Sequence, residues 1–393
     1  MQIPAFVDKN PIVQRLPVPV RARVESFVDN LNTVLAVENL RVMGRMGPSA
    51  VRGLFLRRGR DGVAGMQAHH RAHFDFDYPG DHPEMRALYE KAKRMQWNGA
   101  TDLPWETSVD PLDPEVPIVG TDFIDWRQIA AHGRRFDERE KRDFLHRVAA
   151  WMLSQFLHGE QGALMAAAQV TEATELFDGK FYGATQVMDE ARHVEVFHRY
   201  LVDKLGMRYE INDNLFTIID GLMTDGRWDM KFLGMQILVE GLALGAFATL
   251  RRMTAEPLLA ELLRRVMHDE ARHVHYGLLA LRGYYAKLPE RERREREDWA
   301  FEVVVLMRNR FLAHELYEEQ FAPVLPRREW NALMEKMPGL AIFRRTMFRR
   351  LVPNLRAIGL LTPRVLPHYH RVGLGEYVDL PATDALTESA AFA

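Results

Sequence analysis

The chain has 393 residues, of which 47% are hydrophobic and 27% are charged, so it has enough apolar mass for a substantial buried core. Its 52 basic and 54 acidic residues nearly cancel, which excludes the strongly basic footprint of a nucleic-acid-binding protein. It has no cysteine, which excludes disulfides, cysteine-ligated zinc, iron–sulfur clusters and a fused rubredoxin-type module. Any electrons that the protein consumes must therefore come from elsewhere.

The first region, residues 1–130, is repeatedly broken by proline. Its pattern predicts helical stretches over 20–46 and 82–96, and an irregular stretch over 97–126 that is rich in turn residues and aromatics. We expect this stretch to cover a neighbouring domain rather than to fold independently. Residues 1–19 lack the charged-then-apolar layout of a signal peptide, which favours a cytoplasmic protein.

The second region, residues 131–289, is helical and poor in proline, with apolar residues recurring at intervals of three and four. Its most apolar stretch, residues 232–250, is nearly as long as a membrane span. It carries Gln236 and Glu240 at its centre, and an ionised group there is costly in lipid. We therefore predict a helix buried inside protein, and no membrane contact. The third region, residues 290–393, predicts helices over 290–319, 328–335 and 341–358, and a weakly ordered tail of about a dozen residues.

An internal repeat identifies the candidate site. The hexapeptide Asp-Glu-Ala-Arg-His-Val occurs at 189–194 and again at 269–274, 80 residues later. Thirty residues before the glutamate of each copy stands another glutamate, Glu160 or Glu240, in an apolar helical context. The two halves of the second region therefore carry the same chemistry at the same spacing.

The spacing predicts two antiparallel helical hairpins. The midpoint of 160 and 190 lies near Phe177-Asp178-Gly179, and the midpoint of 240 and 270 lies next to Glu256-Pro257. Equal arms bring the paired glutamates to the same height, roughly 20 Å from each turn at 1.5 Å per residue. We predict an all-α, ferritin-like four-helix bundle, with a crossover over about 206–228 and with the first and third regions packed around it.

Within each hexapeptide the glutamate and the histidine are three residues apart and share one helix face. The bundle core then receives one carboxylate from each of two helices and a Glu-x-x-His pair from each of the others, as in di-iron and di-manganese carboxylate proteins. Two divalent cations would neutralise the four glutamates, and this donor set suits iron, with manganese as the alternative. The predicted ligands, which are also the predicted catalytic residues, are Glu160, Glu190, His193, Glu240, Glu270 and His273.

The residues that flank these ligands have a predicted supporting role. A ligating imidazole usually donates its second ring proton to a carboxylate. Asp189 and Asp269 are placed to accept that proton from the histidine of the opposite hairpin, and Arg192 and Arg272 are placed to neutralise the aspartates.

On these motifs, the stretch from Asp137 to Lys287 resembles the ferritin-like di-iron oxygenases. It is most similar to the hydroxylase subunits of bacterial multicomponent monooxygenases and to the benzoyl-CoA epoxidase type, and more distantly to the arylamine N-oxygenases. The resemblance implies two iron ions that activate O₂ after reduction by a partner reductase or electron-transfer protein. It also implies oxygenation of a small organic substrate, aromatic or an acyl thioester. We further expect a homodimer.

Two departures narrow the resemblance. The position of the radical tyrosine of ribonucleotide reductase small subunits is occupied here by Phe197, which argues against radical storage. The additional histidine ligand of the N-oxygenases is replaced by Val266, with Gln186 at the corresponding place in the first copy. This weakens an N-oxygenase assignment without excluding it.

Other residues with ligand character fit the pattern less well. Glu195 and His198 also have ligand spacing, but they lie about 140° around the helix from Glu190, and the repeat does not preserve them. The histidines and aspartates of 69–77 lie in a loop without partner motifs. Two other functions stay open, namely a ferroxidase or iron/manganese oxidase without an organic substrate, and a bundle that holds metal only for folding.

Overall fold

A computed structural model describes residues 10–385, and every regular element in that range is helical, as predicted. The elements before the bundle are α2 (Pro11–Gln14), α3 (Val18–Leu35), α4 (Leu40–Ala50), the π-helical η1 (Val51–Phe55), η2 (Arg58–Asp61), α5 (Pro83–Arg94), η3 (Thr121–Phe123) and α6 (Trp126–Ala131). The elements of the central region are α7 (Glu138–Ala173), α8 (Phe177–Arg199), the π-helical η4 (Tyr200–Leu205), α9 (Asp213–Thr224), α10 (Trp228–Phe232), the π-helical η5 (Leu233–Val239), α11 (Glu240–Met253), α12 (Pro257–Leu281) and η6 (Tyr285–Lys287). The remaining elements are α13 (Glu290–Arg310), α14 (His314–Leu316), the π-helical η7 (Tyr317–Phe321), α15 (Arg327–Lys336), α16 (Pro338–Ala357), α17 (Leu366–Arg371), η8 (Gly375–Tyr377) and η9 (Thr383–Ala385).

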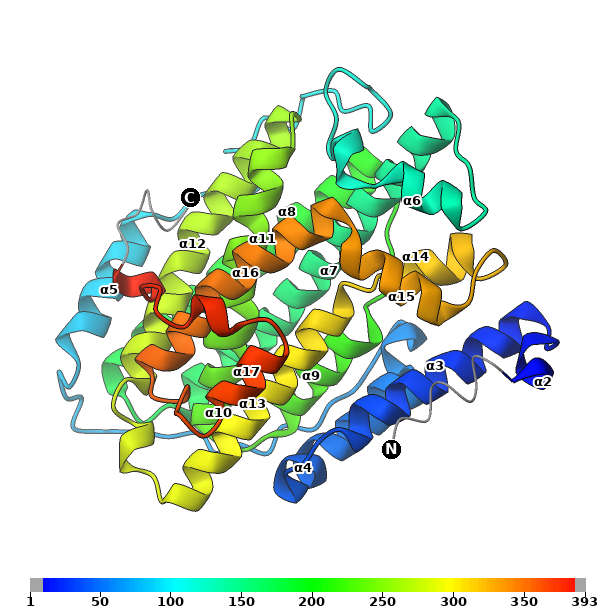
Figure 1. The fold of residues 1–393 in the computed structure, drawn as a ribbon. Coiled ribbons are helices and arrows are strands. Elements are labelled where there is room, and N and C mark those ends of the chain that lie inside the picture. The colour runs from blue at the N-terminus through cyan, green and yellow to red at the C-terminus, as the bar shows by residue number, and fades with distance from the viewer. Residues whose placement is uncertain (1–9, 386–393) are drawn as a thin grey trace.

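Helices α7, α8, α11 and α12 form the predicted four-helix bundle, with α7 packed on α8 and α11 on α12 (Figure 1). The first hairpin begins at a capping box, in which Asp137 accepts from the backbone N–H of Glu140 at 2.8 Å and Glu140 accepts from that of Asp137 at 2.9 Å. Its turn lies between Ala173 and Phe177, next to the predicted midpoint. The hairpin geometry expected from the repeat is therefore confirmed here.

The second hairpin turns between Met253 and Pro257, also as predicted. Pro257 occupies the first helical position of α12, where a missing N–H costs nothing. The Glu256 carboxylate accepts from the N–H groups of Leu258 and Leu259 and also from the Tyr200 hydroxyl, at 2.7 Å. The start of α12 is thereby tied to the end of the first hairpin.

The apolar stretch around Glu240 is one helical run, Trp228–Met253, made of α10, η5 and α11. By length and composition it is the one candidate membrane span among residues 10–385, and 94% of its apolar window is buried inside the protein. The prediction of a buried core helix is confirmed. A π-helical stretch lies directly before Glu240, and such stretches change the direction of the side chains that follow.

The connection between the hairpins contains a helix that the sequence pattern did not predict. Helix α9 packs against α7, α4 and α13 and takes the chain from one hairpin to the other. Its start is capped by Asn212, whose side chain accepts from the N–H of Asn214 at 3.0 Å.

Two predicted helices are interrupted. The stretch 20–46 is divided into α3 and α4, because the Asn39 side chain accepts from the N–H of Arg41 and starts a new helix there. The helix predicted over 290–319 ends at Arg310. Shortly after it, Ala313 takes a left-handed backbone conformation with φ 49°. Between Trp97 and Trp126 the described backbone is irregular apart from η3, and it buries Leu103 and Ile118 against the rest of the protein.

Helix α16 lies against α11 and covers the bundle from one side (Figure 1). A Cβ atom at Gly245 would lie 2.8 Å from the Cα of Met347, so only glycine permits this close approach. One hydrophobic core contains residues of all three predicted regions. Their division into domains at 130 and 289 stays a prediction, and most of the predicted C-terminal tail lies outside the described residues.

Candidate metal centre

Six acidic and imidazole side chains meet inside the bundle. They are Glu160 on α7, Glu190 and His193 on α8, Glu240 on α11, and Glu270 and His273 on α12. None of the six is more than 4% exposed to solvent. The structure thus brings together all the residues that the repeat singled out.

The six residues form two overlapping groups. In one group, Nδ1 of His193 lies 3.2 Å from Glu270 Oε1 and 3.3 Å from Glu160 Oε2. In the other, Nδ1 of His273 lies 3.0 Å from Glu190 Oε1 and 4.0 Å from Glu240 Oε2. Glu190 belongs to both groups, and each histidine approaches the glutamate of the other Glu-x-x-His pair. This is the arrangement of two cation sites joined by shared carboxylates.

Although imidazole and carboxylate atoms of the cluster lie close to one another, several of the predicted metal-ligating atoms are buried and make no hydrogen bond of acceptable geometry. They are Glu190 Oε2, Glu240 Oε2, both carboxylate oxygens of Glu270, and His273 Nδ1. A buried polar atom without a partner is strongly destabilising, and a cation ligated by it removes that cost. The oxygen-rich donor set with two imidazoles fits two iron ions, or manganese.

The acid–base state of the cluster indicates the same need for positive charge. Burial raises the pKa of Glu160 and of Glu240, and the charges of neighbouring carboxylates raise both further. Burial also opposes the charged imidazole of His193 and of His273, but the surrounding carboxylates outweigh it and raise both pKa values well above the ordinary value. The cluster therefore favours added positive charge, which two divalent ions would supply.

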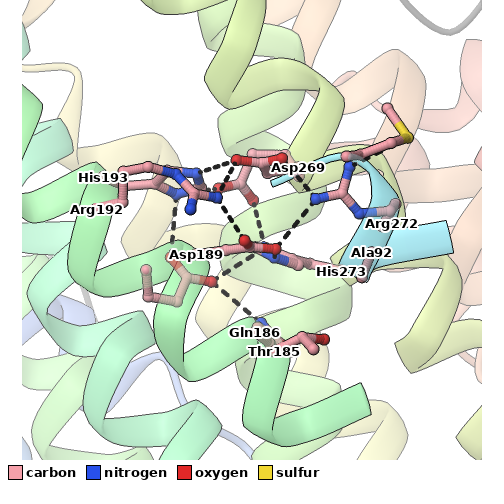
Figure 2. Close-up of polar contacts among 12 residues, drawn as sticks. Ala92, Thr185, Gln186, Asp189, Arg192, His193, Asp269, Arg272 and His273 are labelled. Carbon is pink, nitrogen blue, oxygen red and sulfur yellow. Dashed lines mark hydrogen bonds and ion pairs between the residues drawn. The ribbon is translucent and has the colours of Figure 1, made fainter. Parts of the chain in front are cut away.

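Each histidine is held from behind by an aspartate of the opposite hairpin. Nε2 of His193 lies 3.1 Å from Asp269 Oδ2, and Nε2 of His273 lies 3.3 Å from Asp189 Oδ2. A proton on Nε2 directs the lone pair of Nδ1 into the carboxylate cluster, which is the tautomer that a metal ligand requires. Figure 2 shows this crossed arrangement of the two histidines and two aspartates.

Two arginines neutralise the aspartates. Arg192 contacts Asp189 on its own helix and Asp269 at 3.0 Å on the other, and Arg272 contacts Asp269 on its own helix and Asp189 at 3.1 Å (Figure 2). All four side chains are buried. The contacts expected from the sequence are present, and their effect on metal binding stays a prediction.

The structure adds a chain of polar contacts to the ligands. From the sequence, Gln236 was expected only as a polar residue of a cavity beside the metals. The Gln186 amide donates to Glu190 Oε1 at 3.1 Å and to Glu240 Oε1 at 2.8 Å, while Gln236 donates to Gln186 at 3.2 Å. Gln186 thus fixes the orientation of two predicted ligands on different hairpins. Two sequence signals pointed to this position, which lies one turn before Glu190 and corresponds in the repeat to Val266, where the N-oxygenases have their additional histidine ligand.

The covering region also reaches the site. The Trp97 indole donates to Asp269 Oδ2 at 2.8 Å, and its ring lies 4.7 Å from the guanidinium carbon of Arg192. The Gln96 side chain donates to Asp189 and accepts from Arg192. These residues are distant in sequence from the repeat, and no spacing rule connects them to it.

The other candidates lie outside the centre. Glu195 and His198 are exposed, and in the loop His70 pairs with Glu172 at 2.6 Å. Among residues 10–385 the groups that could hold a metal ion contain none of the residues of 69–77. Phe197 is buried against Phe156 and Phe247. Apolar packing therefore fills the position at which ribonucleotide reductase small subunits carry their radical tyrosine.

Comparisons with known proteins give only remote likenesses. No protein-family model matches the chain, and the search of curated proteins gives no match. Among solved structures, an R2-like ligand-binding oxidase variant with an anaerobically reconstituted Mn/Fe cofactor is 19% identical, with a TM-score of 0.42 over 68% of this chain and 94% of that chain. A second variant, also with an anaerobically reconstituted Mn/Fe cofactor, is 19% identical, with a TM-score of 0.42 over 71% of this chain and 99% of that one.

An R2-like ligand-binding oxidase after photoconversion is 18% identical, with a TM-score of 0.39 over 68% of this chain and 94% of that chain. At these values the likeness supports no functional conclusion. The monooxygenase type expected from the sequence stays a prediction.

Proposed function

We propose that the protein is a non-haem di-iron oxygenase, in which the six clustered residues bind two iron ions, with manganese as an alternative at either site. The observation that carries the proposal is the set of buried carboxylate and imidazole atoms without partners, arranged in two overlapping groups. Two neighbouring redox ions of this kind supply the electrons that reduce O₂.

The surroundings of the cluster favour such chemistry because they keep water out. Phe156, Phe197 and Phe247 form a buried aromatic group, with ring centroids of Phe156 and Phe247 4.8 Å apart. On α7 and η5, Ala163 and Ile237 are also buried. A dry site strengthens electrostatic interactions and protects reactive species from hydrolysis.

The proposed reaction is the oxygenation of a small organic substrate, by hydroxylation, epoxidation or N-oxygenation. One oxygen atom of O₂ enters the substrate and the other leaves as water, which consumes two electrons and two protons. The absence of cysteine supports a separate reductase or electron-transfer protein as the electron source. Aromatic compounds and acyl thioesters are the substrate classes that the sequence resemblance favours.

Rapid mixing tests this function. The protein loaded anaerobically with ferrous iron is mixed with O₂, and absorption and O₂ consumption are recorded. We expect a transient coloured species, O₂ uptake, and faster decay of the transient when a substrate of the proposed classes is present. A transient that no organic compound accelerates would favour a ferroxidase or metal oxidase, and no O₂ uptake would leave only a structural metal site.

A matched variant controls this experiment. Glu240→Ala removes a predicted ligand, whereas Glu195→Ala removes an exposed carboxylate near the metal-binding motif of α8. The first variant should lose the transient and the second should retain it.

A further inference from the structure

A concave site lies among the C-terminal helices. It has a volume of about 330 Å³ and lies between the end of α13, the end of α15, the first half of α16 and the chain after α17. This volume is within the range of small-molecule sites. None of these elements carries a predicted metal ligand, so the cavity is distinct from the metal centre.

Three arginines, Arg308, Arg344 and Arg345, line this cavity against a single carboxylate, Glu335. The Arg344 guanidinium donates to the backbone carbonyls of Met334 and Glu335, which fixes its position at the end of α15. The Arg308 guanidinium donates to the amide oxygen of Asn309 at 3.3 Å. Both side chains are partly buried, and the contacts described for them involve neutral oxygens rather than a carboxylate.

Several buried arginines elsewhere in the protein are instead paired closely with acids. Arg296 lies 2.9 Å from Asp229, and Arg272 contacts both aspartates of the metal centre. Helix α16 carries five arginines and no acidic residue. Burial lowers the pKa of Arg344, the charge of Glu335 opposes this effect, and the positive charge of Arg308 adds to it.

The floor of the cavity is apolar. It is formed by the buried side chains of Phe311, Phe348, Leu374 and Tyr377. Two glycines shape the wall that carries Leu374. Gly373 has φ 78°, and a Cβ atom at Gly375 would lie 1.9 Å from His370 Nδ1. The wall is therefore a specific local structure rather than a chance gap between side chains.

We propose that this cavity binds an organic phosphate monoester, with its apolar body on the aromatic floor and its phosphate on the arginines. The two negative charges of the phosphate would balance the net positive charge of three guanidinium groups and one carboxylate. Arginine is suited to this role because its planar donors bind phosphate oxygens in pairs. This inference does not depend on the function proposed for the metal centre.

Calorimetric titration of the metal-loaded protein with phenyl phosphate tests the proposal, at one fixed ionic strength. Inorganic phosphate lacks the apolar body, benzyl alcohol lacks the charge, and benzoate carries a single charge. We expect one phenyl phosphate per chain, with weaker binding of inorganic phosphate and benzoate and none of benzyl alcohol. Arg308→Met and Arg344→Met should each weaken phenyl phosphate binding about tenfold or more, because a charge-assisted hydrogen bond contributes that much.

The controls separate binding from folding. Arg23→Met removes an exposed arginine of α3 and should leave the affinity unchanged, while Arg308→Lys should retain part of it. If Arg344→Met unfolds because α15 loses its contacts, Arg308→Met and Arg345→Met decide the matter. No binding by the unmodified protein, or equal binding by the cavity variants, would overturn the proposal and leave the arginines as a docking surface for an acidic protein.

Discussion

At the scale of single residues, the contact of each histidine with the aspartate of the opposite hairpin determines how the imidazole faces the cluster. Asp269 accepts from His193, Trp97 and Arg192 through one carboxylate oxygen, and from Arg272 through the other. Every one of these donors would lose an acceptor if the carboxylate were removed. The orientation of a predicted ligand therefore depends on a residue that does not itself reach the ions.

We predict that Asp269→Ala lowers the iron affinity about 10- to 100-fold, the usual effect of removing a carboxylate that supports a ligating histidine. Asp269→Asn keeps the side-chain volume but removes the charge. It should also lower the iron affinity, which would attribute the loss to the charge rather than to packing. The measurement is a competition titration with a ferrous chelator. Asp203→Asn, which changes an exposed aspartate of η4, is the control, and an unchanged affinity in Asp269→Ala would contradict the assignment.

His314 provides a pH-dependent contribution far from the cluster. Its Nε2 donates to Asn331 at 2.8 Å and its Nδ1 accepts from Arg327 at 2.7 Å, so the imidazole is neutral. Burial and the charges of Arg327, Arg57 and Arg60 lower its pKa well below the ordinary value. The unfolded chain therefore binds the proton first when the pH falls below about 6.5.

It follows that the free energy of unfolding decreases as the pH falls from about 6.5 towards the lowered pKa of folded His314, by up to about 1.4 kcal/mol per pH unit from this group. Urea unfolding at several pH values should show a smaller decrease in His314→Gln than in the unmodified protein. Parallel curves for the two proteins would show that His314 does not contribute.

Some residues of the centre are predictable from sequence and others are not. The repeat places the ligands and their aspartates because both copies keep one spacing along one helix face. Trp97 contacts the centre through the packing of a separate element, and its sequence position carries no comparable periodicity. Gln186 lies one turn before Glu190, but its contact with Glu240 depends on the packing of the two hairpins. Tertiary contacts of this kind become visible only in the folded chain.

At the scale of elements, equal arms and turn residues were sufficient to predict both hairpins. The predicted helices failed where a single side chain or backbone conformation interrupts an apolar pattern, at Asn39 and at Ala313. Helix α9 was missed because its region was interpreted only as a connection. Local capping therefore decides the boundaries, whereas periodicity decides the existence of long elements.

The packing of α16 on α11 gives an element-scale prediction. A Cβ atom at Gly245 would lie 2.8 Å from Met347 Cα and 2.9 Å from Thr346 O, both backbone atoms that cannot move independently. Gly245→Ala should lower the free energy of unfolding by about 1–3 kcal/mol, as overpacking does. Gly241→Ala, one turn earlier, meets only Asn354 Nδ2 at 3.6 Å and should raise it by up to about 1 kcal/mol. Equal effects of the two substitutions in urea unfolding would contradict the close approach.

At the scale of the whole molecule, a hydrophobic core continuous through all three regions surrounds a polar centre that its own residues do not fully satisfy. A core of this size can hold four buried carboxylates only if positive charge accompanies them. The homodimer, the cytoplasmic location and the partner reductase stay predictions.

The most direct measurement is metal analysis combined with anomalous diffraction at the iron edge on crystals of the iron-loaded protein. Two iron ions per chain should be found, with two anomalous peaks inside the bundle, one beside His193 and one beside His273, and Glu190 and Glu270 between them. In Glu160→Ala the peak beside His193 should weaken more than the peak beside His273. A protein with no bound iron, or with its peaks outside the six residues, would contradict the account.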